Sequence, residues 1–147
     1  MINILLADDN YTVRQGVQAL LKAEPDFCIV GEAGDGLEAA RLVKQLHPDI
    51  LVADLMMGGV NGIEVTRQVC KSSPSTNVII ISIYGNEAYA FEALRAGAKA
   101  YVLKEAVPGE LAHAIREVAA GGSYLSPPLS EKSLEAYRQK LANTEQL

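Results

Sequence analysis

Polar side chains follow four of the apolar runs along this sequence. Asp8 and Asp9 come directly after the first run, and Asp54 follows the third. Ser82 ends the fourth run, and Lys104 follows the fifth. Three carboxylates in one place repel one another unless a cation joins them, and oxygen ligands favour a hard ion such as Mg²⁺. With that ion bound, a carboxylate can attack a phosphoryl group while the metal and an ammonium neutralise the transferring oxygens. These residue types therefore indicate magnesium-dependent aspartyl-phosphate chemistry.

Such chemistry requires the ends of several strands to meet. Five short runs are continuously apolar and rich in Ile, Val and Leu, which is typical of strands buried on both faces of a parallel sheet. The predicted strands are Ile2–Ala7, Phe27–Ala33, Ile50–Ala53, Val78–Ser82 and Ala100–Leu103.

Helical patterns lie between these runs. Apolar residues recur at helical spacing at positions 13, 17, 20 and 21, and again at 111, 114, 115 and 118. Weaker amphipathic stretches cover Leu37–Leu46, Ile63–Lys71 and Asn86–Ala96. This alternation predicts an α/β fold, a doubly wound five-stranded parallel sheet with helices on both faces. Ligands of such sheets bind outside the carboxyl ends of the strands, where the polar residues would converge.

Composition and charge narrow the function classes. The chain has 147 residues, 49% of them hydrophobic, which suits one packed domain. Its 18 acidic and 13 basic residues give a net charge of −5, a poor match to a nucleic-acid-binding surface. The longest apolar runs, Ile2–Ala7 and Val78–Tyr84, are too short for a signal peptide core or a membrane span, so we expect a soluble, cytoplasmic protein. Cys28 and Cys70 lie in apolar patterns without metal-ligand spacing, which favours core thiols over a disulfide or metal site.

Each polar residue also has an ordinary structural explanation. Asp9 or Asn10 could cap a helix, and Asp54 could begin a turn. Ser82 could simply end a strand, and Lys104 could be a solvated surface charge. The joint occurrence of these residue types at neighbouring strand ends favours the functional interpretation.

At these positions the sequence resembles the receiver domains of two-component response regulators, over about Ile2 to Gly121. The matching motifs are Asp8-Asp9, the stretch D-L-M-M-G-G-V-N-G from Asp54 to Gly62, Ser82 and Lys104. The sequence is most similar to the NarL/FixJ (LuxR-type) subfamily, through the segments A-D-D-N-Y-T-V-R-Q-G, L-R-A-G-A-K-A-Y-V-L-K-E and A-I-R-E-V-A-A-G-G-S-Y-L-S-P. The resemblance implies a flavodoxin-like sheet with strand order 2-1-3-4-5.

The resemblance also implies a role for each residue of the acidic pocket. Asp54 would be the phosphoacceptor and a ligand of the cofactor Mg²⁺. Asp9 would bind Mg²⁺ directly and Asp8 through water, and the backbone carbonyl of Met56 would supply a further oxygen.

A second group of residues would respond to the phosphoryl group. Ser82 would hydrogen-bond a phosphoryl oxygen, and Lys104 would pair with it. Tyr101 would change rotamer when Ser82 moves, so that the surface of the fourth helix, fifth strand and fifth helix becomes the output face. Met56 and Tyr84 would flank the path of the hydrolytic water and modulate dephosphorylation.

Taken together, the resemblance implies a signalling switch that receives its phosphoryl group from a sensor histidine kinase. It would control transcription through an attached DNA-binding domain, and it would catalyse only its own magnesium-dependent phosphorylation and dephosphorylation. A homodimer could form through the output face or through the first and fifth helices. No membrane partner is expected.

The C-terminal part departs from the strand and helix alternation. Residues 1–121 are the expected receiver domain, and residues 122–147 are expected to form a linker and a short helix at Glu131–Leu141. This helix could dock on the domain or on a partner. We expect the linker to lead to a helix-turn-helix domain that is missing from this chain; a natural single-domain regulator is the alternative.

Three positions depart from the family pattern. Asn10 replaces a common His, Gly58 stands where Pro is frequent, and Glu105 follows Lys104 where Pro is common. Gly58 is expected to loosen its loop, because glycine has the greatest backbone freedom. None of these changes removes a reacting group.

Three other functions compete with the switch. A phosphohydrolase of the haloacid-dehalogenase kind needs a second carboxylate two residues after its nucleophile, but Asn10 stands two residues after Asp8. A flavin or nucleotide module needs a Gly/Ser/Thr-rich first loop, whereas this loop carries two negative charges. A scaffold that signals without phosphorylation would bind its partner equally well after Asp54→Asn.

Overall fold

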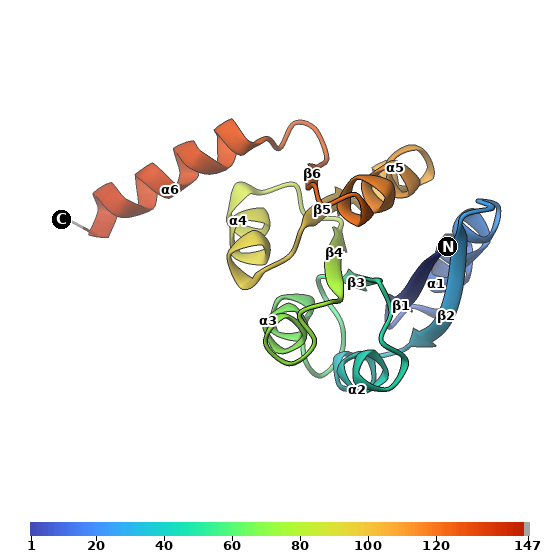
Figure 1. The fold of residues 1–147 in the computed structure, drawn as a ribbon. Helices are drawn as coiled ribbons and strands as arrows, with labels where there is room; N and C mark the ends of the chain where they lie inside the picture. Colours follow the sequence, from blue (N-terminus) through green and yellow to red (C-terminus); the bar gives the residue numbers. More distant parts are fainter. Residues whose placement is uncertain (146–147) are drawn as a thin grey trace.

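Six parallel strands form one sheet in the computed structural model, which describes residues 1–145 (Figure 1). Their order is β2-β1-β3-β4-β5-β6, so the predicted order of the first five strands is confirmed. The strands are β1 Ile2–Ala7, β2 Phe27–Ala33, β3 Ile50–Asp54, β4 Asn77–Ser82, β5 Ala100–Leu103 and β6 Tyr124–Leu125. The last two positions of the predicted linker, 146 and 147, lie outside the described residues.

Helices cover both faces of the sheet, as predicted. The side chains of α1 and α5 pack on one face, and those of α2, α3 and α4 pack on the other (Figure 1). The helices are α1 Tyr11–Lys22, α2 Gly36–Leu46, α3 Gly62–Ser72, α4 Glu87–Ala96, the short 3₁₀ helix η1 Lys104–Ala106, α5 Val107–Ala119 and α6 Glu131–Glu145.

The first three helices begin at polar capping residues. The side chains of Asn10, Asp35 and Asn61 each accept a hydrogen bond from the backbone N–H three residues later. These bonds satisfy donors that have no partner inside the helix. Asn10, which stands in place of the family's common His, therefore caps α1.

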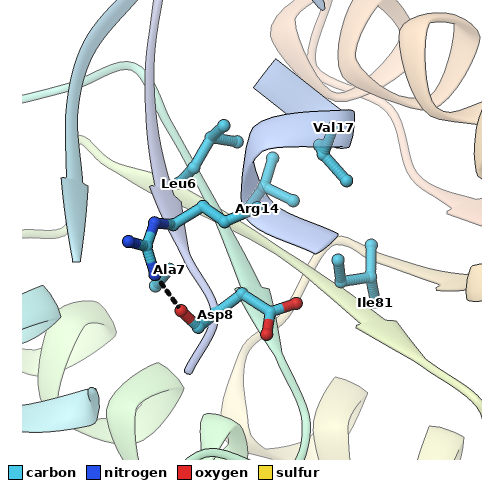
Figure 2. Close-up of a pocket in the computed structure, with 7 residues that line it drawn as sticks. Leu6, Ala7, Asp8, Arg14, Val17 and Ile81 are labelled. Carbon is cyan, nitrogen blue, oxygen red and sulfur yellow. Dashed lines mark hydrogen bonds between the residues drawn. The ribbon is translucent and has the colours of Figure 1, made fainter. Parts of the chain in front are cut away.

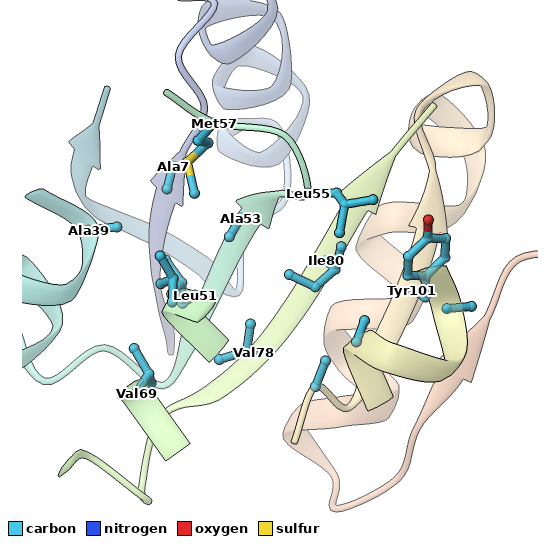
Figure 3. Packing of buried hydrophobic residues seen from close by; sticks show 14 of the residues in the cluster. Ala7, Ala39, Leu51, Ala53, Leu55, Met57, Val69, Val78, Ile80 and Tyr101 are labelled. Carbon is cyan, nitrogen blue, oxygen red and sulfur yellow. The ribbon is translucent and has the colours of Figure 1, made fainter. Parts of the chain in front are cut away.

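Alternation of side chains along the strands divides the core into two layers. On β1, Ile4 and Leu6 pack against α1 and α5, whereas Leu5 and Ala7 pack against the helices of the opposite face. Figure 3 shows the second layer, in which Tyr101 of β5 and aliphatic side chains of β1, β3 and β4 belong to one cluster. Burial on both faces holds the four central strands, β1, β3, β4 and β5, in register and therefore aligns their carboxyl ends.

The sixth strand lies inside the segment predicted as a linker. Tyr124–Leu125 pairs with β5, and the backbone N–H of Ser126 donates to the carbonyl of Tyr101 at 3.0 Å. The Ser126 hydroxyl accepts from the N–H of Leu103 at 3.0 Å and donates to Glu110 Oε1 at 3.0 Å. This segment is therefore fastened to the strand that leads to Lys104.

Helix α6 docks on the domain through its N-terminal half. Leu134 is 6% exposed and belongs to the core layer, and the rings of Tyr137 and Phe91 on α4 lie 5.4 Å apart. Beyond these contacts the helix extends away from the sheet (Figure 1). Of the two predicted alternatives, docking on the domain is what the structure shows.

The prediction of two core thiols is wrong for Cys28. Both cysteines are free, but Cys28 is exposed while Cys70 is partly buried. Cys28 lies on β2, whose middle residues are only partly covered because this strand is at the edge of the sheet. Between residues 1 and 145, no helix has the length and apolar character that a membrane span requires.

Candidate functional site

The carboxyl ends of the central strands bring three aspartates together. Ala7 pairs with Ala53, so Asp8 and Asp54 follow paired positions of neighbouring strands. Asp8, Asp9 and Asp54 each offer a carboxylate oxygen within 4.8 Å of the others. Asp8 and Asp54 are buried, whereas Asp9 is exposed. The predicted acidic cluster therefore exists, with one carboxylate open to solvent.

Lys104 reaches the same cluster from the end of β5. Its Nζ donates to Asp54 Oδ2 at 3.1 Å and lies 3.5 Å from Asp8 Oδ2. Burial by itself lowers the pKa of Lys104, but the contacts with Asp54 and Asp8 outweigh it and raise that pKa above its usual value. The Lys104 ammonium therefore stays charged. It is paired with aspartates, so the alternative of a solvated surface charge does not hold.

Asp54 ionises less readily than an ordinary aspartate. Burial is the main cause that raises its pKa, and the negative charge of Asp8 is the second. The hydrogen bond and charge of Lys104 act in the opposite direction without cancelling these effects. A further cation in the pocket would offset the remaining repulsion.

The geometry of Asp8 fits a metal ion. Its Oδ1 accepts a hydrogen bond from the N–H of Asn10 at 2.9 Å. Its Oδ2 is buried and has no hydrogen-bond partner among residues 1–145. This oxygen faces the Lys104 ammonium at 3.5 Å, but a buried carboxylate oxygen without a hydrogen bond is costly, and a metal ion would provide a direct partner. Three clustered carboxylates provide the oxygen donors that Mg²⁺ prefers, so the side chains present fit that ion.

Ser82, Tyr84 and Tyr101 form a connected group beside the acidic cluster. Ser82 is buried at the end of β4, and its Oγ accepts from the N–H of Tyr84 at 2.9 Å. The hydroxyl of Tyr101 donates to the carbonyl of Tyr84 at 2.7 Å. Burial raises the pKa of Tyr101, so its hydroxyl remains a donor. The backbone of Tyr84 thus joins the two predicted switch residues.

The arrangement of polar residues at the strand ends is shared with a known protein family. The profile of the response regulator receiver domain matches residues 4–116. The chain belongs to this family. The match covers all four strand ends that carry the polar residues described above.

Relatives of the receiver domain are transcriptional regulators. The chain is 36% identical over 145 residues to the transcriptional regulatory protein DegU of Brevibacillus brevis, covering 99% of this chain and 61% of that protein. It is 37% identical over 143 residues to LiaR of Bacillus subtilis strain 168, covering 97% of this chain and 68% of that protein. The chain therefore spans about two thirds of the length of these relatives.

A solved structure agrees with the sequence relatives. A two-component response regulator of the LuxR family from Aurantimonas sp. SI85-9A1 superposes with a TM-score of 0.86 at 36% identity, covering 92% of this chain and 96% of that one. The predicted NarL/FixJ (LuxR-type) subfamily is therefore confirmed.

The loop after Asp54 is tied to the acidic cluster of the receiver domain. The N–H of Gly58 donates to Asp9 Oδ2 at 3.2 Å, a bond that the Pro frequent at this position could not make. The backbone nitrogen of Met56 donates to Asp54 Oδ1 at 3.4 Å, and Met56 is 44% exposed. A Cβ on Gly62 would lie 2.5 Å from the Asp54 carbonyl oxygen, so glycine is required where α3 approaches β3. The Gly58 N–H therefore restrains the loop after Asp54, although glycine by itself is expected to make that loop more flexible.

Metal-free receiver domain is expected to become more stable when Asp54 is replaced by Asn. The raised pKa of Asp54 means that the folded state holds this proton more tightly than the unfolded state. The free energy of unfolding therefore falls as pH rises from the ordinary Asp value through the raised one. Asparagine removes this penalty, so we expect a higher Tm for the variant than for the wild type at pH 7.

Differential scanning calorimetry in the presence of a chelator checks this expectation. The difference in Tm between wild type and Asp54→Asn should narrow towards the lowest pH at which both remain folded. A difference that does not depend on pH, or a less stable variant at pH 7, would contradict the expectation.

Proposed function

We propose that this receiver domain is a phosphorylation switch whose phosphoacceptor is Asp54. One observation carries the proposal: a buried carboxylate with a raised pKa lies 3.1 Å from an ammonium and beside two further aspartates. A carboxylate oxygen of Asp54 forms a bond to phosphorus while the bond between phosphorus and a histidine nitrogen of a sensor kinase breaks. The released imidazole takes up a proton from solvent.

The surrounding residues have separate roles in this proposal. Asp8, Asp9 and Asp54 would hold Mg²⁺ with the backbone carbonyl of Met56, and the ion would neutralise charge on the transferring oxygens when bound. Lys104 supplies a second positive charge from the carboxyl end of β5. The chain catalyses only its own phosphorylation and dephosphorylation.

Acetyl phosphate provides a direct test that needs no kinase. Incubation of the receiver domain with acetyl phosphate and Mg²⁺ should add the mass of one phosphoryl group, and peptide mapping should place it on Asp54. The same incubation with a chelator should add nothing. An unchanged mass in the presence of Mg²⁺ would refute the proposal, and sustained hydrolysis of phosphomonoesters would favour a phosphohydrolase instead.

Ser82 and Tyr101 would transmit the phosphorylated state. A phosphoryl oxygen that accepts a hydrogen bond from Ser82 competes with the bond between Ser82 and Tyr84. The Tyr84 carbonyl holds the hydroxyl of Tyr101, so movement at Ser82 changes which position of Tyr101 is favoured. Tyr101 also accepts a backbone bond from Ser126, which leads into α6. These contacts support an output through α4, β5, α5 and the docked α6.

The wider proposal concerns the whole protein. Its relatives of greater length are transcriptional regulators, which supports a cytoplasmic regulator that contacts DNA through an attached domain. A homodimer through the α4-β5-α5 face or through α1 and α5 remains part of this proposal. Size-exclusion chromatography with light scattering, before and after phosphorylation, tests dimer formation.

Tyr84 is expected to slow hydrolysis of the phosphorylated state. The residue is 36% exposed, and its ring packs against Tyr89, with the two centroids 5.0 Å apart. By resemblance to the family, the side chain at this position, two residues after Ser82, would restrict water access to Asp54. Tyr84→Ala should increase the dephosphorylation rate several-fold, measured as loss of the phosphoryl mass with time. Tyr84→Phe keeps the ring and should retain the wild-type rate; equal rates in all three proteins would contradict the shielding role.

A further inference from the structure

Arg14 of α1 touches the acidic pocket through a backbone atom (Figure 2). Its Nη1 donates to the carbonyl oxygen of Asp8 at 2.6 Å. That carbonyl belongs to the planar peptide group that joins Asp8 to Asp9, so fixing its direction restrains the backbone from which both carboxylates extend. We propose that Arg14 is a positioning residue for the metal-binding carboxylates, an inference that rests on the proposed Mg²⁺ pocket.

Arg14 is itself held in place by Glu32 and Tyr11. Its Nε donates to Glu32 Oε1 on β2 at 2.9 Å, and Gln15 donates to the same oxygen at 2.8 Å. The ring of Tyr11 lies 5.4 Å from the guanidinium carbon, and the Arg14 side chain is only 15% exposed. The planar guanidinium binds Glu32 and Asp8 at the same time through different nitrogens. Arg14 therefore links the Glu32 side chain on β2 to the backbone that follows β1.

In the small cavity beside Asp8, Arg14 is the one side chain among residues 1–145 that can donate a hydrogen bond. This cavity is lined, apart from Asp8 and Arg14, by apolar residues: Leu6, Ala7, Val17, Val52 and Ile81. Figure 2 shows the guanidinium on one side of Asp8 and the carboxylate directed away from it. The N–H of Asp8 donates to Ala33 and its Oδ1 accepts from Asn10, which leaves Oδ2 for the metal. Together with these bonds, the bond from Arg14 fixes the orientation of Asp8 and hence the position of its Oδ2.

Metal affinity is the property that a positioning role must change. Groups that orient metal ligands typically alter affinity by about 10- to 100-fold when removed. Isothermal titration calorimetry with Mg²⁺ alone, without any phosphodonor, should therefore show roughly tenfold weaker binding for Arg14→Met. The matched control is Arg67→Met, which removes an exposed, ion-paired arginine from α3 and should bind Mg²⁺ like the wild type.

Two further variants separate positioning from general stabilisation. Arg14→Lys keeps the charge but cannot span Glu32 and Asp8 with one planar group, so its affinity should lie between those of wild type and Arg14→Met. Glu32→Gln weakens the hold on Arg14 and should also weaken Mg²⁺ binding, which keeps the test decisive if Arg14→Met does not fold. A lowered Tm with unchanged Mg²⁺ affinity in the folded variants would overturn the inference. Absence of Mg²⁺ binding by the wild type would instead overturn the proposed metal pocket.

Discussion

Asp54→Asn is expected to abolish phosphorylation by acetyl phosphate while leaving the receiver domain folded. The amide has nearly the shape of the carboxylate, so it can still accept the hydrogen bond that Lys104 now gives to Asp54. It lacks the anionic oxygen that attacks phosphorus, so no covalent bond can form. Intact-mass spectrometry should show the added phosphoryl mass in the wild type and none in the variant.

The control for this experiment is another aspartate on the same molecule. Asp35 is exposed and caps α2 through its side chain, a role that asparagine also performs well. Asp35→Asn should therefore gain the phosphoryl mass like the wild type. A phosphoryl group on the Asp54→Asn protein would place the acceptor elsewhere and remove the basis of the proposed function.

Lys104→Gln is expected to reduce the phosphorylation rate about a hundredfold, the usual cost of losing one donor to developing charge. Its ammonium contacts both Asp54 and Asp8, and its pKa is raised by these contacts despite the opposing effect of burial. Glutamine can donate a hydrogen bond but supplies no charge to the transferring oxygens. The rate is measured as the appearance of phosphorylated protein at a fixed acetyl phosphate concentration.

Mg²⁺ affinity shows whether this loss arises in the reaction or in the metal site. Lys104 and a metal ion compete for the same carboxylates, so Lys104→Gln should bind Mg²⁺ at least as tightly as the wild type. Lys99→Gln, an exposed lysine before β5, should change neither quantity. A Lys104→Gln protein that is phosphorylated at the wild-type rate would exclude the proposed electrostatic role.

Much of the fold could be read from the sequence because its signals are local. The apolar runs at Ile2–Ala7, Phe27–Ala33 and Ala100–Leu103 have the bounds of β1, β2 and β5. Burial between two helical layers requires continuous apolar stretches, and such stretches are visible without knowledge of the partners. Exposure of Cys28 was not visible in this way, because it depends on β2 lying at the edge of the sheet.

The sixth strand and the docked helix were harder to predict. Tyr124–Leu125 is too short to show an alternating pattern, and it pairs with β5 through backbone groups that any sequence carries. The hydroxyl of Ser126 is fixed by Leu103 of β5 and Glu110 of α5, which both lie far from it in the sequence. No short-range signal identifies such partners.

For the site, the sequence by itself determined which chemical groups stand at the strand ends. Asp8, Asp9, Asp54 and Lys104 were identifiable because parallel strands must present their carboxyl ends at one edge. Only the tertiary structure decided how these groups are held: Arg14 binds the Asp8 carbonyl, and Gly58 binds the Asp9 carboxylate. The physical reason is that residue type and spacing follow the chain, whereas hydrogen bonds follow distance in space, which only the packed sheet and helices define.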